Sequence, residues 1–463
     1  MTLIKSISGI RGTIGGKPGE SLTPVDVVKF TSAYGSWIKK SGGSKIIIGR
    51  DARVSGKMVS DLVVATLTAL GLDVIDLGLS TTPTVEFAVP REFADGGIIL
   101  TASHNPGNWN ALKLLNAQGE FISDAEGKAL LKIAESGEFE FQTVEKLGKV
   151  SKRKNYIAAH IRAVLNYPLV DREAIRNAGF RIAVDAVNSS GGIAVPELLK
   201  ALGVKTIKKI NCKPTGLFAH NPEPLPDNLK KICKKTVKGQ YDLGIVVDPD
   251  VDRLVLIRED GIPFGEEYTL VAVADYMLSR YKGKKTATVS NLSSTRALRD
   301  LTTKYGHKYF AAAVGEVNVV LKMKSEKALI GGEGNGGIIV PDFHYGRDAL
   351  IGIALFLTHL ARSGKTMSRL RSGYPDYHIS KNKIELSPKV DVDKILAQIK
   401  SRYKKEKIDL TDGIRIDFEK KKEWVHLRKS NTEPIIRIIA EAPGESRARQ
   451  LAEKIMADIA AVS

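Results

Sequence analysis

Three aspartates alternate within one short polar stretch of the chain. The stretch reads DPDVDR, from Asp248 to Arg253, and it follows LGIVV, an apolar run typical of a buried strand. Carboxylates at this density supply the hard oxygen ligands that Mg²⁺ prefers, and the guanidinium of Arg253 adds a positive charge that can hold a phosphate. A turn that merely caps a helix is the alternative. The clustered aspartates favour a metal site made by Asp248, Asp250 and Asp252.

A serine and a histidine are adjacent in TASHNP, residues 101–106, which also follows an apolar run. Ser103 lacks the G-x-S-x-G surroundings of a hydrolase nucleophile. Neighbouring side chains on a turn usually point apart, so a catalytic pair with His104 is not supported. A serine that accepts a phosphoryl group needs a divalent cation, positive charge and an acid or base. Lys113 is a candidate for the proton transfer if burial lowers its pKa.

Two further loops carry groups suited to a phosphorylated sugar. GGEGNGG, residues 331–337, places Glu333 and Asn335 on a flexible backbone, where a carboxylate and an amide can grip adjacent hydroxyls. It does not have the G-x-G-x-x-G form that opens a helix, so a dinucleotide site is disfavoured. KSNTEPIIR, residues 429–437, offers hydroxyls and backbone N–H groups between two arginines, a nest for a phosphate monoester. A solvated hairpin turn remains an equal alternative for this last loop.

The elements that position these loops follow a threefold repeat. Each repeat has a β-rich run, a polar loop, an amphipathic helical stretch, a glycine that ends the helix and a second strand-like run. The first β-rich runs are residues 46–48, 182–184 and 286–290, and the helices are expected at residues 57–70, 193–202 and 297–305. Each repeat closes with a third apolar run, which ends in TASHNP, DPDVDR or GEGNGG. Ligands bind outside the carboxyl ends of strands in α/β sheets, so we expect these loops to converge on one cleft.

The chain from about residue 370 has a different layout. Strands WVHLR and IIRIIAEA flank KSNTEP, and helices are expected at residues 392–403 and 446–461. We therefore expect an α/β protein with three similar α/β domains, each with a mixed sheet, and a smaller C-terminal α+β domain. The four domains would surround one central cleft. Their expected boundaries are residues 1–150, 151–256, 257–368 and 369–463.

Composition narrows the class of protein. The chain has 463 residues, of which 43% are hydrophobic and 26% are charged, as in a soluble multidomain protein. No apolar run is long enough to span a bilayer, no signal peptide is evident, and two cysteines do not make a disulfide framework. We expect a cytoplasmic protein with no membrane partner. The net charge of +18 is spread along the chain with little aromatic interleaving, which favours small anionic ligands over nucleic acid.

Together the loops resemble the motifs of the α-D-phosphohexomutase family, whose members interconvert hexose 1- and 6-phosphates. TASHNP with NALK resembles the phosphoserine loop, and DPDVDR resembles the D-G-D-G-D-R metal loop. GEGNGG resembles the G-E-x-S-G-H sugar loop, RKSNTEP the R-x-S-G-T-E-P phosphate loop, and SGIRG the D-G-I-R-G motif near the start. The likeness runs nearly end to end, and four ordered loops with fitting spacing make it highly specific.

The resemblance implies a role for each matching position. Ser103 would carry a phosphate and would hold one Mg²⁺ per chain together with Asp248, Asp250 and Asp252. Arg253 would contact the transferring group, Lys113 would be a candidate acid or base, and His104 would assist. Glu333 and Asn335 would bind sugar hydroxyls. The non-reacting phosphate would be held by Arg428, Ser430, Asn431, Thr432 and Arg437. The electrostatics of the cleft would be shaped by Arg11, Arg50 and Arg53.

The implied reaction consists of two phosphoryl transfers. Phosphoserine would give its phosphate to the sugar, and the other phosphate of the resulting bisphosphate would return to Ser103. A hexose 1,6-bisphosphate would therefore act as an activator, and a phosphorylated hexose would be the substrate of a monomer or homodimer.

Some positions depart from the family pattern. Ala111, Pro249, Val251 and Asn431 replace glycines, Asn335 replaces the serine of the sugar loop, and Gly337 replaces its histidine. These departures affect the choice of sugar more than the chemistry. SGIRGTIGG is closer to phosphoglucosamine mutases, which we favour, whereas GEGNGG is closer to phosphoglucomutases and phosphomannomutases of broader specificity.

Two functions of other classes remain as alternatives. A metal-dependent sugar phosphatase would not need the second phosphate site in KSNTEP. A non-catalytic phosphosugar-binding protein would not need Ser103 and the three aspartates together.

Overall fold

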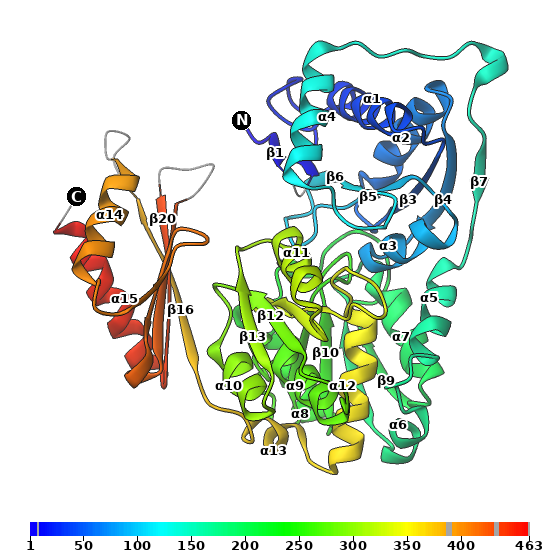
Figure 1. Ribbon diagram of the computed structural model, residues 1–463. Helices are drawn as coiled ribbons and strands as arrows, with labels where there is room; N and C mark the ends of the chain where they lie inside the picture. Colours follow the sequence, from blue (N-terminus) through cyan, green and yellow to red (C-terminus); the bar gives the residue numbers. More distant parts are fainter. Residues whose placement is uncertain (7–8, 386–390, 430–434, 462–463) are drawn as a thin grey trace. The chain divides into compact units, whose positions relative to one another are not determined.

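The computed structural model describes residues 1–6, 9–385, 391–429 and 435–461. It divides into two compact units. Figure 1 labels the helices and strands of the chain. The large unit comprises residues 1–276 and 335–370, and the small unit comprises residues 277–334 and 371–463. Four domains make up the chain, namely three α/β domains with mixed or parallel sheets and a C-terminal α+β domain, as the sequence predicts. Among the described residues, no helix combines the length and the hydropathy that crossing a membrane requires.

The first α/β domain has a seven-stranded sheet in the order β1-β2-β6-β5-β3-β4-β7. The strands are β1 (Ile4–Ser6), β2 (Gly9–Thr13), β3 (Lys45–Arg50), β4 (Asp73–Leu79), β5 (Gly96–Leu100), β6 (Trp109–Leu115) and β7 (Val150–Lys152). The register is parallel among β5, β3, β4 and β7 and antiparallel from β5 through β6 to β1. The sheet is therefore mixed, as expected.

Helices cover both faces of this sheet. They are α1 (Pro24–Lys40), α2 (Gly56–Ala69), α3 (Thr82–Arg91) and α4 (Asp124–Ser136). Ile46 and Ile48 of β3 belong to the core beneath α1, α2 and α4, whereas Ile47 belongs to the core beneath α3. Successive side chains of a strand point to opposite faces, so a strand that is apolar throughout must be buried on both.

The second domain has a four-stranded sheet in the order β11-β10-β8-β9. Its strands are β8 (Arg181–Asp185), β9 (Thr206–Ile210), β10 (Leu243–Val247) and β11 (Leu254–Arg258), and its helices are α5 (Tyr156–Leu165), α6 (Arg172–Ala178), α7 (Gly191–Ala201) and α8 (Lys230–Lys238). Strand β8 is parallel to β9 and β10, while β11 returns antiparallel to β10. The tight return between β10 and β11 creates the turn that holds DPDVDR.

The third repeat is divided between the two units. In the small unit, β12 (Ala287–Asn291) lies between the parallel strands β13 (Lys308–Ala312) and β14 (Ile330–Glu333), with helices α10 (Arg296–Lys304) and α11 (Glu316–Glu326). In the large unit lie β15 (Gly337–Ile339) and the buried helix α12 (Ala349–Ser363). Helices α9 (Glu266–Arg280) and α13 (Met367–Arg371) each contain a boundary between the units.

The C-terminal domain has a five-stranded antiparallel sheet in the order β16-β20-β19-β18-β17. The strands are β16 (His378–Glu385), β17 (Lys407–Asp409), β18 (Ile414–Phe418), β19 (Glu423–Lys429) and β20 (Ile435–Ala442), and the helices are α14 (Val392–Arg402) and α15 (Glu445–Ala460). This domain joins β12–β14 in one unit partly through the carboxylate of Asp412, which accepts the N–H of Val314 at 2.9 Å. The predicted C-terminal helices and strands are confirmed to within one residue at each end.

Candidate active site

The three aspartates of DPDVDR lie in the turn between β10 and β11 and are fully buried. One carboxylate oxygen from each lies within 4.8 Å of the other two. Burial, followed by the charges of Asp252 and Asp250, raises the pKa of Asp248 well above its usual range. Burial also acts to raise the pKa of Asp250, but the ammonium of Lys113 outweighs it and holds that pKa below its ordinary value. The three carboxylates repel one another, so a bound cation would stabilise their ionised forms.

The two oxygens of Asp250 and of Asp252 differ in their partners. Asp250 Oδ2 accepts hydrogen bonds from Lys113 Nζ at 2.8 Å and from Thr82 Oγ1 at 2.6 Å. Asp252 Oδ2 accepts one from Arg347 Nη2 at 2.6 Å. The Oδ1 atoms of both aspartates are buried and have no hydrogen-bond partner among the described residues. A pair of orphaned carboxylate oxygens in an all-oxygen donor set fits a hard divalent cation.

The backbone of this turn is strained at one residue. Val251 has φ of 65°, in the left-handed region where a β-branched residue is rarely found. The family pattern has glycine at this position, which adopts that conformation without steric cost. Val251 is nevertheless fully buried and packs near the start of α7. Packing therefore compensates for the backbone strain that the missing glycine would have avoided.

The TASHNP loop brings Ser103 directly to the aspartates. Ser103 Oγ donates a hydrogen bond to Asp248 Oδ2 at 2.8 Å, although the two residues are 145 positions apart. Ser103 has φ of 47°, and its N–H donates to Thr101 Oγ1 at 2.9 Å, so the loop turns sharply after β5. The expected convergence of this loop with DPDVDR is thus present within the large unit.

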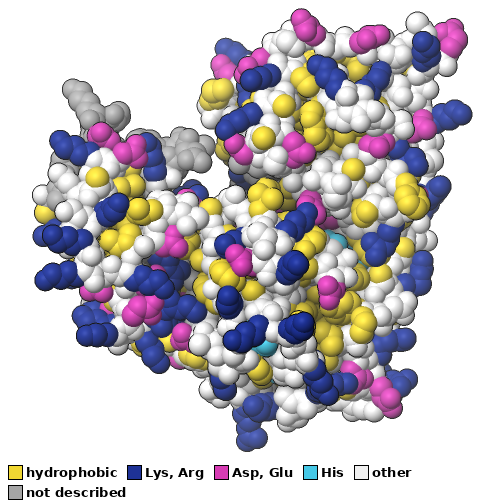
Figure 2. Space-filling model, in the orientation of Figure 1, with side chains coloured by type: hydrophobic (Ala, Val, Ile, Leu, Met, Phe, Trp, Pro, Cys, Tyr) yellow, Lys and Arg dark blue, Asp and Glu magenta, His cyan; other side chains and the backbone are white. Residues whose placement is uncertain are grey.

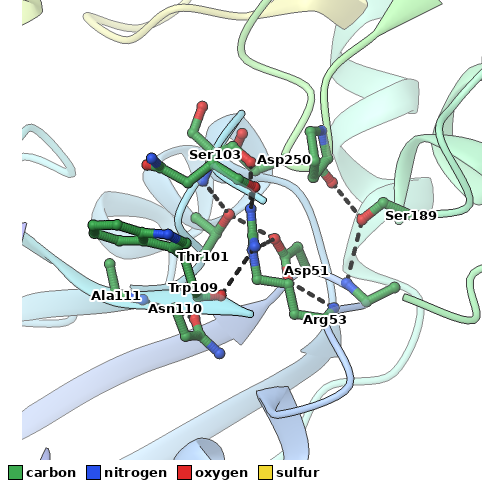
Figure 3. Close-up of polar contacts among 12 residues, drawn as sticks. Asp51, Arg53, Thr101, Ser103, Trp109, Asn110, Ala111, Ser189 and Asp250 are labelled. Atoms are coloured by element: carbon green, nitrogen blue, oxygen red, sulfur yellow. Dashed lines mark hydrogen bonds and ion pairs between the residues drawn. The ribbon is translucent and has the colours of Figure 1, made fainter. Parts of the chain in front are cut away.

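Arg53 organises the TASHNP loop from beneath (Figure 3). Its Nη2 donates to the carbonyl oxygens of Ser103 and Asn105, at 2.6 and 2.7 Å. Its Nη1 donates to those of Pro106 and Trp109, at 2.6 and 2.9 Å, and its Nε donates to Asp51 Oδ2 at 3.0 Å. All five N–H donors of the guanidinium are used. Arg53 is buried and holds the loop in place, and its expected effect on the electrostatics of the cleft stays a prediction.

Two serines hold the DPDVDR turn, and one of them also contacts the first domain. Ser189 and Ser190, in the loop before α7, donate from Oγ to the carbonyl oxygen of Pro249 at 2.7 and 2.9 Å. Ser189 Oγ also accepts the N–H of Ala52 at 3.3 Å, beside Arg53 (Figure 3). In the first repeat, the loop after β3 therefore supports TASHNP through Arg53. In the second repeat, the loop after β8 supports DPDVDR through Ser189 and Ser190. The sequence analysis missed these serines, whose place in NSSGG at a helix start was the available signal.

The pKa of Lys113 is shifted in the opposite direction from the one expected, and the pKa of its neighbour in the site, His104, is lowered. Burial acts to lower the pKa of Lys113, but the nearby carboxylates of Asp250 and Asp252 outweigh it, so the pKa is raised. The premise that burial would lower the pKa of Lys113 is therefore wrong, because two carboxylates lie 2.8 and 3.6 Å from its Nζ. Burial, followed by the charge of Arg253, lowers the pKa of His104 to about 3. Its Nδ1 lies 3.4 Å from Ser103 Oγ, closer than the expected divergence of neighbouring side chains.

Two arginines offer N–H groups that the protein does not use. The Nε atoms of Arg11 and Arg253 are buried and have no hydrogen-bond partner among the described residues. Arg11 on β2 is opposite Ala111 on β6, and Lys113 follows two residues later on the same face of the sheet. Burial lowers the pKa of Arg11. Unpaired buried donors beside a serine and a carboxylate cluster fit an anionic ligand such as a phosphate.

The large unit also contains Asn335 of the sugar loop. Asn335 Oδ1 accepts the N–H of Gly337 at 3.2 Å and lies 3.5 Å from Nη1 of Arg347. The sequence analysis missed Arg347, which stands in YGRDAL before α12. Nothing in that motif taken alone points to the metal loop 95 residues earlier.

The small unit holds the other predicted site residues. Glu333 Oε1 accepts hydrogen bonds from Asn291 Nδ2 at 2.9 Å and from the N–H of Gly315 at 3.2 Å. Arg428 on β19 lies directly opposite Arg437 on β20, and Arg428 Nε is 2.8 Å from Asp412 Oδ2. Like charges opposite each other destabilise a sheet unless an anion separates them. Ser430, Asn431 and Thr432 lie outside the described residues.

The chain belongs to the phosphoglucomutase/phosphomannomutase family. Models of its three alpha/beta/alpha domains match residues 3–141, 158–261 and 265–377, and the model of its C-terminal domain matches residues 385–458. The chain is therefore a phosphohexomutase, an isomerase that transfers a phosphoryl group within a hexose phosphate.

Curated relatives agree with this assignment over nearly the whole chain. A phosphoglucomutase/phosphomannomutase of Thermococcus kodakarensis is 36% identical over 449 residues, which cover 96% of each chain. A probable phosphoglucosamine mutase of Methanopyrus kandleri is 31% identical over 97% of this chain and 96% of its own. A phosphoglucosamine/phosphogalactosamine mutase of Sulfurisphaera tokodaii is 32% identical, with 96% of this chain and 97% of its own covered.

Solved structures share the fold. A phosphoglucomutase/phosphomannomutase family protein of Burkholderia thailandensis superposes with a TM-score of 0.85 at 24% identity, covering 99% of this chain and 98% of its own. An N-acetylphosphoglucosamine mutase of Aspergillus fumigatus, solved with GlcNAc-6P and magnesium, has a TM-score of 0.58 at 15% identity, with 94% and 97% covered.

Proposed function

We propose that this phosphohexomutase works through a phosphoserine at Ser103 with Mg²⁺ held by Asp248, Asp250 and Asp252. The observation that carries the proposal is the 2.8 Å hydrogen bond from Ser103 Oγ to Asp248, beside two carboxylate oxygens that lack partners. Magnesium accompanies the sugar phosphate in the fungal relative named above. When bound, the ion would neutralise charge on the phosphoryl oxygens.

In the first transfer, a sugar hydroxyl oxygen attacks phosphorus and its proton passes to a base. The bond from phosphorus to Ser103 Oγ breaks, and Oγ takes a proton from an acid. The unused Nε groups of Arg11 and Arg253 would hold the phosphoryl oxygens. The raised pKa of Lys113 keeps its ammonium charged, which suits charge stabilisation or proton donation better than proton abstraction. The pKa of His104 is lowered to about 3, so its imidazole is neutral and a weak base, which suits orientation of the sugar hydroxyl by a hydrogen bond better than proton abstraction.

In the second transfer, Ser103 Oγ attacks the other phosphate of the bisphosphorylated sugar, and the proton of its hydroxyl passes to a base. The bond from phosphorus to the sugar oxygen breaks, and that oxygen takes a proton from the acid. Arg428 and Arg437, with the loop at residues 430–434, would bind the phosphate that is not reacting. Glu333 and Asn335 would contact the sugar hydroxyls. If the bisphosphorylated intermediate escapes, a hexose 1,6-bisphosphate from solution would restore the phosphoserine. One Mg²⁺ per chain would suffice for both transfers.

The preferred substrate that we propose is glucosamine phosphate, with glucose and mannose phosphates as the alternative. The names of two of the three relatives support it, whereas the most identical of the three is named for glucose and mannose phosphates. Relative kcat/KM values for the three hexose 1-phosphates would decide the preference. A glucose or mannose value above that for glucosamine phosphate would contradict it.

Intact mass tests the phosphoserine directly. We expect wild-type protein treated with glucose 1,6-bisphosphate to gain the mass of one phosphate, and Ser103→Ala to gain none. We also expect Ser103→Ala to lose at least about 1,000-fold in kcat, since the covalent route is gone. Ser136→Ala, an exposed serine on α4, is the matched control. Near wild-type turnover by Ser103→Ala, or release of free phosphate in step with substrate loss, would contradict the mechanism.

A further inference from the structure

Arg347 is a charged partner of DPDVDR that comes from outside the motifs shared with the family. It immediately precedes Asp348, the residue that caps the N-terminus of α12. Its Nη2 donates to Asp252 Oδ2 at 2.6 Å, and the side chain is only 9% exposed. The ion pair leaves Asp252 Oδ1 as the oxygen without a partner among the described residues.

The path of the Arg347 side chain requires glycine at position 337. A Cβ atom placed on Gly337 would lie 2.3 Å from Arg347 Cδ and 3.1 Å from Cγ. These atoms lie in the middle of a side chain whose far end is held by Asp252, so they cannot move aside without breaking the ion pair. Gly337 does not have a positive φ, so its backbone conformation alone would accept other residues.

The steric conflict explains why this chain has Gly337 where the family pattern has histidine. The family pattern G-E-x-S-G-H places histidine where this chain has Gly337. A histidine there and the observed course of Arg347 exclude each other, because both need the same space. Glycine at 337 and arginine at 347 therefore form a matched pair.

We propose that Arg347, admitted by Gly337, is a positioning residue that holds Asp252 by Oδ2 and presents Oδ1 to the divalent cation. The inference rests on the proposed function, in which DPDVDR binds that cation. Lys113 and Thr82 hold Asp250 in the same way. Loss of a hydrogen bond that orients a metal ligand typically weakens metal binding about 10- to 100-fold.

A double-mutant cycle with Mn²⁺ as the probe tests the pair. Gly337→Ala keeps every charge but displaces Arg347, so we expect the Kd for Mn²⁺, measured by electron paramagnetic resonance of the free ion, to rise about tenfold. In an Arg347→Ala background the added methyl group has space, and Gly337→Ala should change the Kd less than about twofold. Arg347→Lys, which keeps the charge but not the planar guanidinium, should also weaken Mn²⁺ binding.

Controls separate the possible failures. Arg162→Ala removes an exposed positive charge on α5 and should leave the Kd unchanged. Melting temperatures of all variants show whether a Kd change is simply unfolding. An unchanged Kd in both Gly337→Ala and Arg347→Lys would overturn the role of Arg347 but not the metal site. The same would follow if Gly337→Ala changed the Kd equally in the wild-type and Arg347→Ala backgrounds. A wild-type chain that binds no Mn²⁺ would overturn the proposed metal site and this assignment with it.

Discussion

At the scale of single residues, Ser103, the proposed phosphate carrier, depends on side chains for which no chemical role is proposed. Ser103 is positioned by Thr101 and by Arg53, whose guanidinium collects four carbonyl oxygens of one loop. A carbonyl left without a donor in a buried site costs about 1–3 kcal/mol. The loop therefore keeps its sharp turn because Arg53 satisfies groups that a loop would otherwise expose to water.

Replacement of Arg53 tests this role. Lysine supplies three donors on a flexible stem rather than five on a rigid fork, so carbonyl groups of the loop lose partners. We expect Arg53→Lys to reduce kcat/KM about 100-fold, the effect of a reactive group displaced by about 1 Å. Steady-state kinetics with a hexose 1-phosphate measures it. Arg50→Lys is the matched control, because Arg50 makes only one contact with a carbonyl, that of Asp51. Equal losses in the two variants would contradict a special role for Arg53.

At the scale of elements, the metal loop is a tight turn between two buried antiparallel strands. Its carboxylates lie close together because Asp248, Asp250 and Asp252 belong to one short turn, residues 248–253, between β10 and β11. Val251 occupies a left-handed conformation that costs a non-glycine residue about 1–2 kcal/mol. The turn is stable because β10, β11 and α7 pack around it, with Ser189 and Ser190 fixing its carbonyl group.

Two neighbouring valines separate strain from packing. Val247 and Val251 are both buried and both approach Gly191 at the start of α7, but only Val251 has a positive φ. Each loses buried surface on replacement by glycine, worth about 1.5–3 kcal/mol. Only Val251→Gly also relieves strain, so it should cost about 1–3 kcal/mol less than Val247→Gly. Urea denaturation gives both values. Equal costs would show that the turn stores no strain.

At the scale of the molecule, positive charge is dispersed rather than focused. Figure 2 shows Lys and Arg side chains scattered over the visible face of the molecule, in agreement with the spread of the +18 charge along the sequence. The cations beside the three aspartates are instead the buried Lys113 and Arg347 and the half-buried Arg253. The chain also crosses between its two units within the sugar loop, so that Glu333 belongs to the small unit and Asn335 to the large one.

A buried charge network connects three domains within the large unit. Asp348 Oδ2 lies 2.9 Å from Nε2 of His160 and 3.1 Å from Nε2 of His344, and Thr84 Oγ1 lies 3.0 Å from His160 Nδ1. Burial acts to raise the pKa of Asp348, but His160 and then His344 outweigh burial and hold that pKa well below its ordinary value. Asp348 is thus a charged link between α3, α5 and α12.

The pH dependence of stability follows from the sign of that shift. The folded pKa lies below the unfolded value of about 3.9, so the stabilisation is complete above that pH and is lost as the pH falls toward the folded pKa. We expect Asp348→Asn, which keeps a helix-capping oxygen, to lower the free energy of unfolding by about 3 kcal/mol at neutral pH. Urea denaturation at pH 7 and near pH 3 should show this difference shrinking. Asp342→Asn, which removes an exposed carboxylate six residues earlier in the chain, is the matched control. A difference that stays constant with pH would contradict the charged link.

The sequence by itself determined the family, most of the elements and the groups that we propose to do the chemistry. The β-rich runs and helix-ending glycines give the strand and helix positions because side-chain periodicity and backbone freedom are local properties. The alternating aspartates, Ser103 and the arginines beside KSNTEP are recognisable because each motif lies within a few consecutive residues.

Only the tertiary structure decided how these groups act on one another. The pKa of Lys113 rises rather than falls because two carboxylates of another domain outweigh its burial, and no local pattern shows that distance. Arg53 is revealed as the organiser of the loop, and Arg347 as the partner of Asp252, by contacts that span 50 and 95 positions of the chain. Electrostatic and steric effects depend on separation in space, and separation in space is set by how the domains fold and pack.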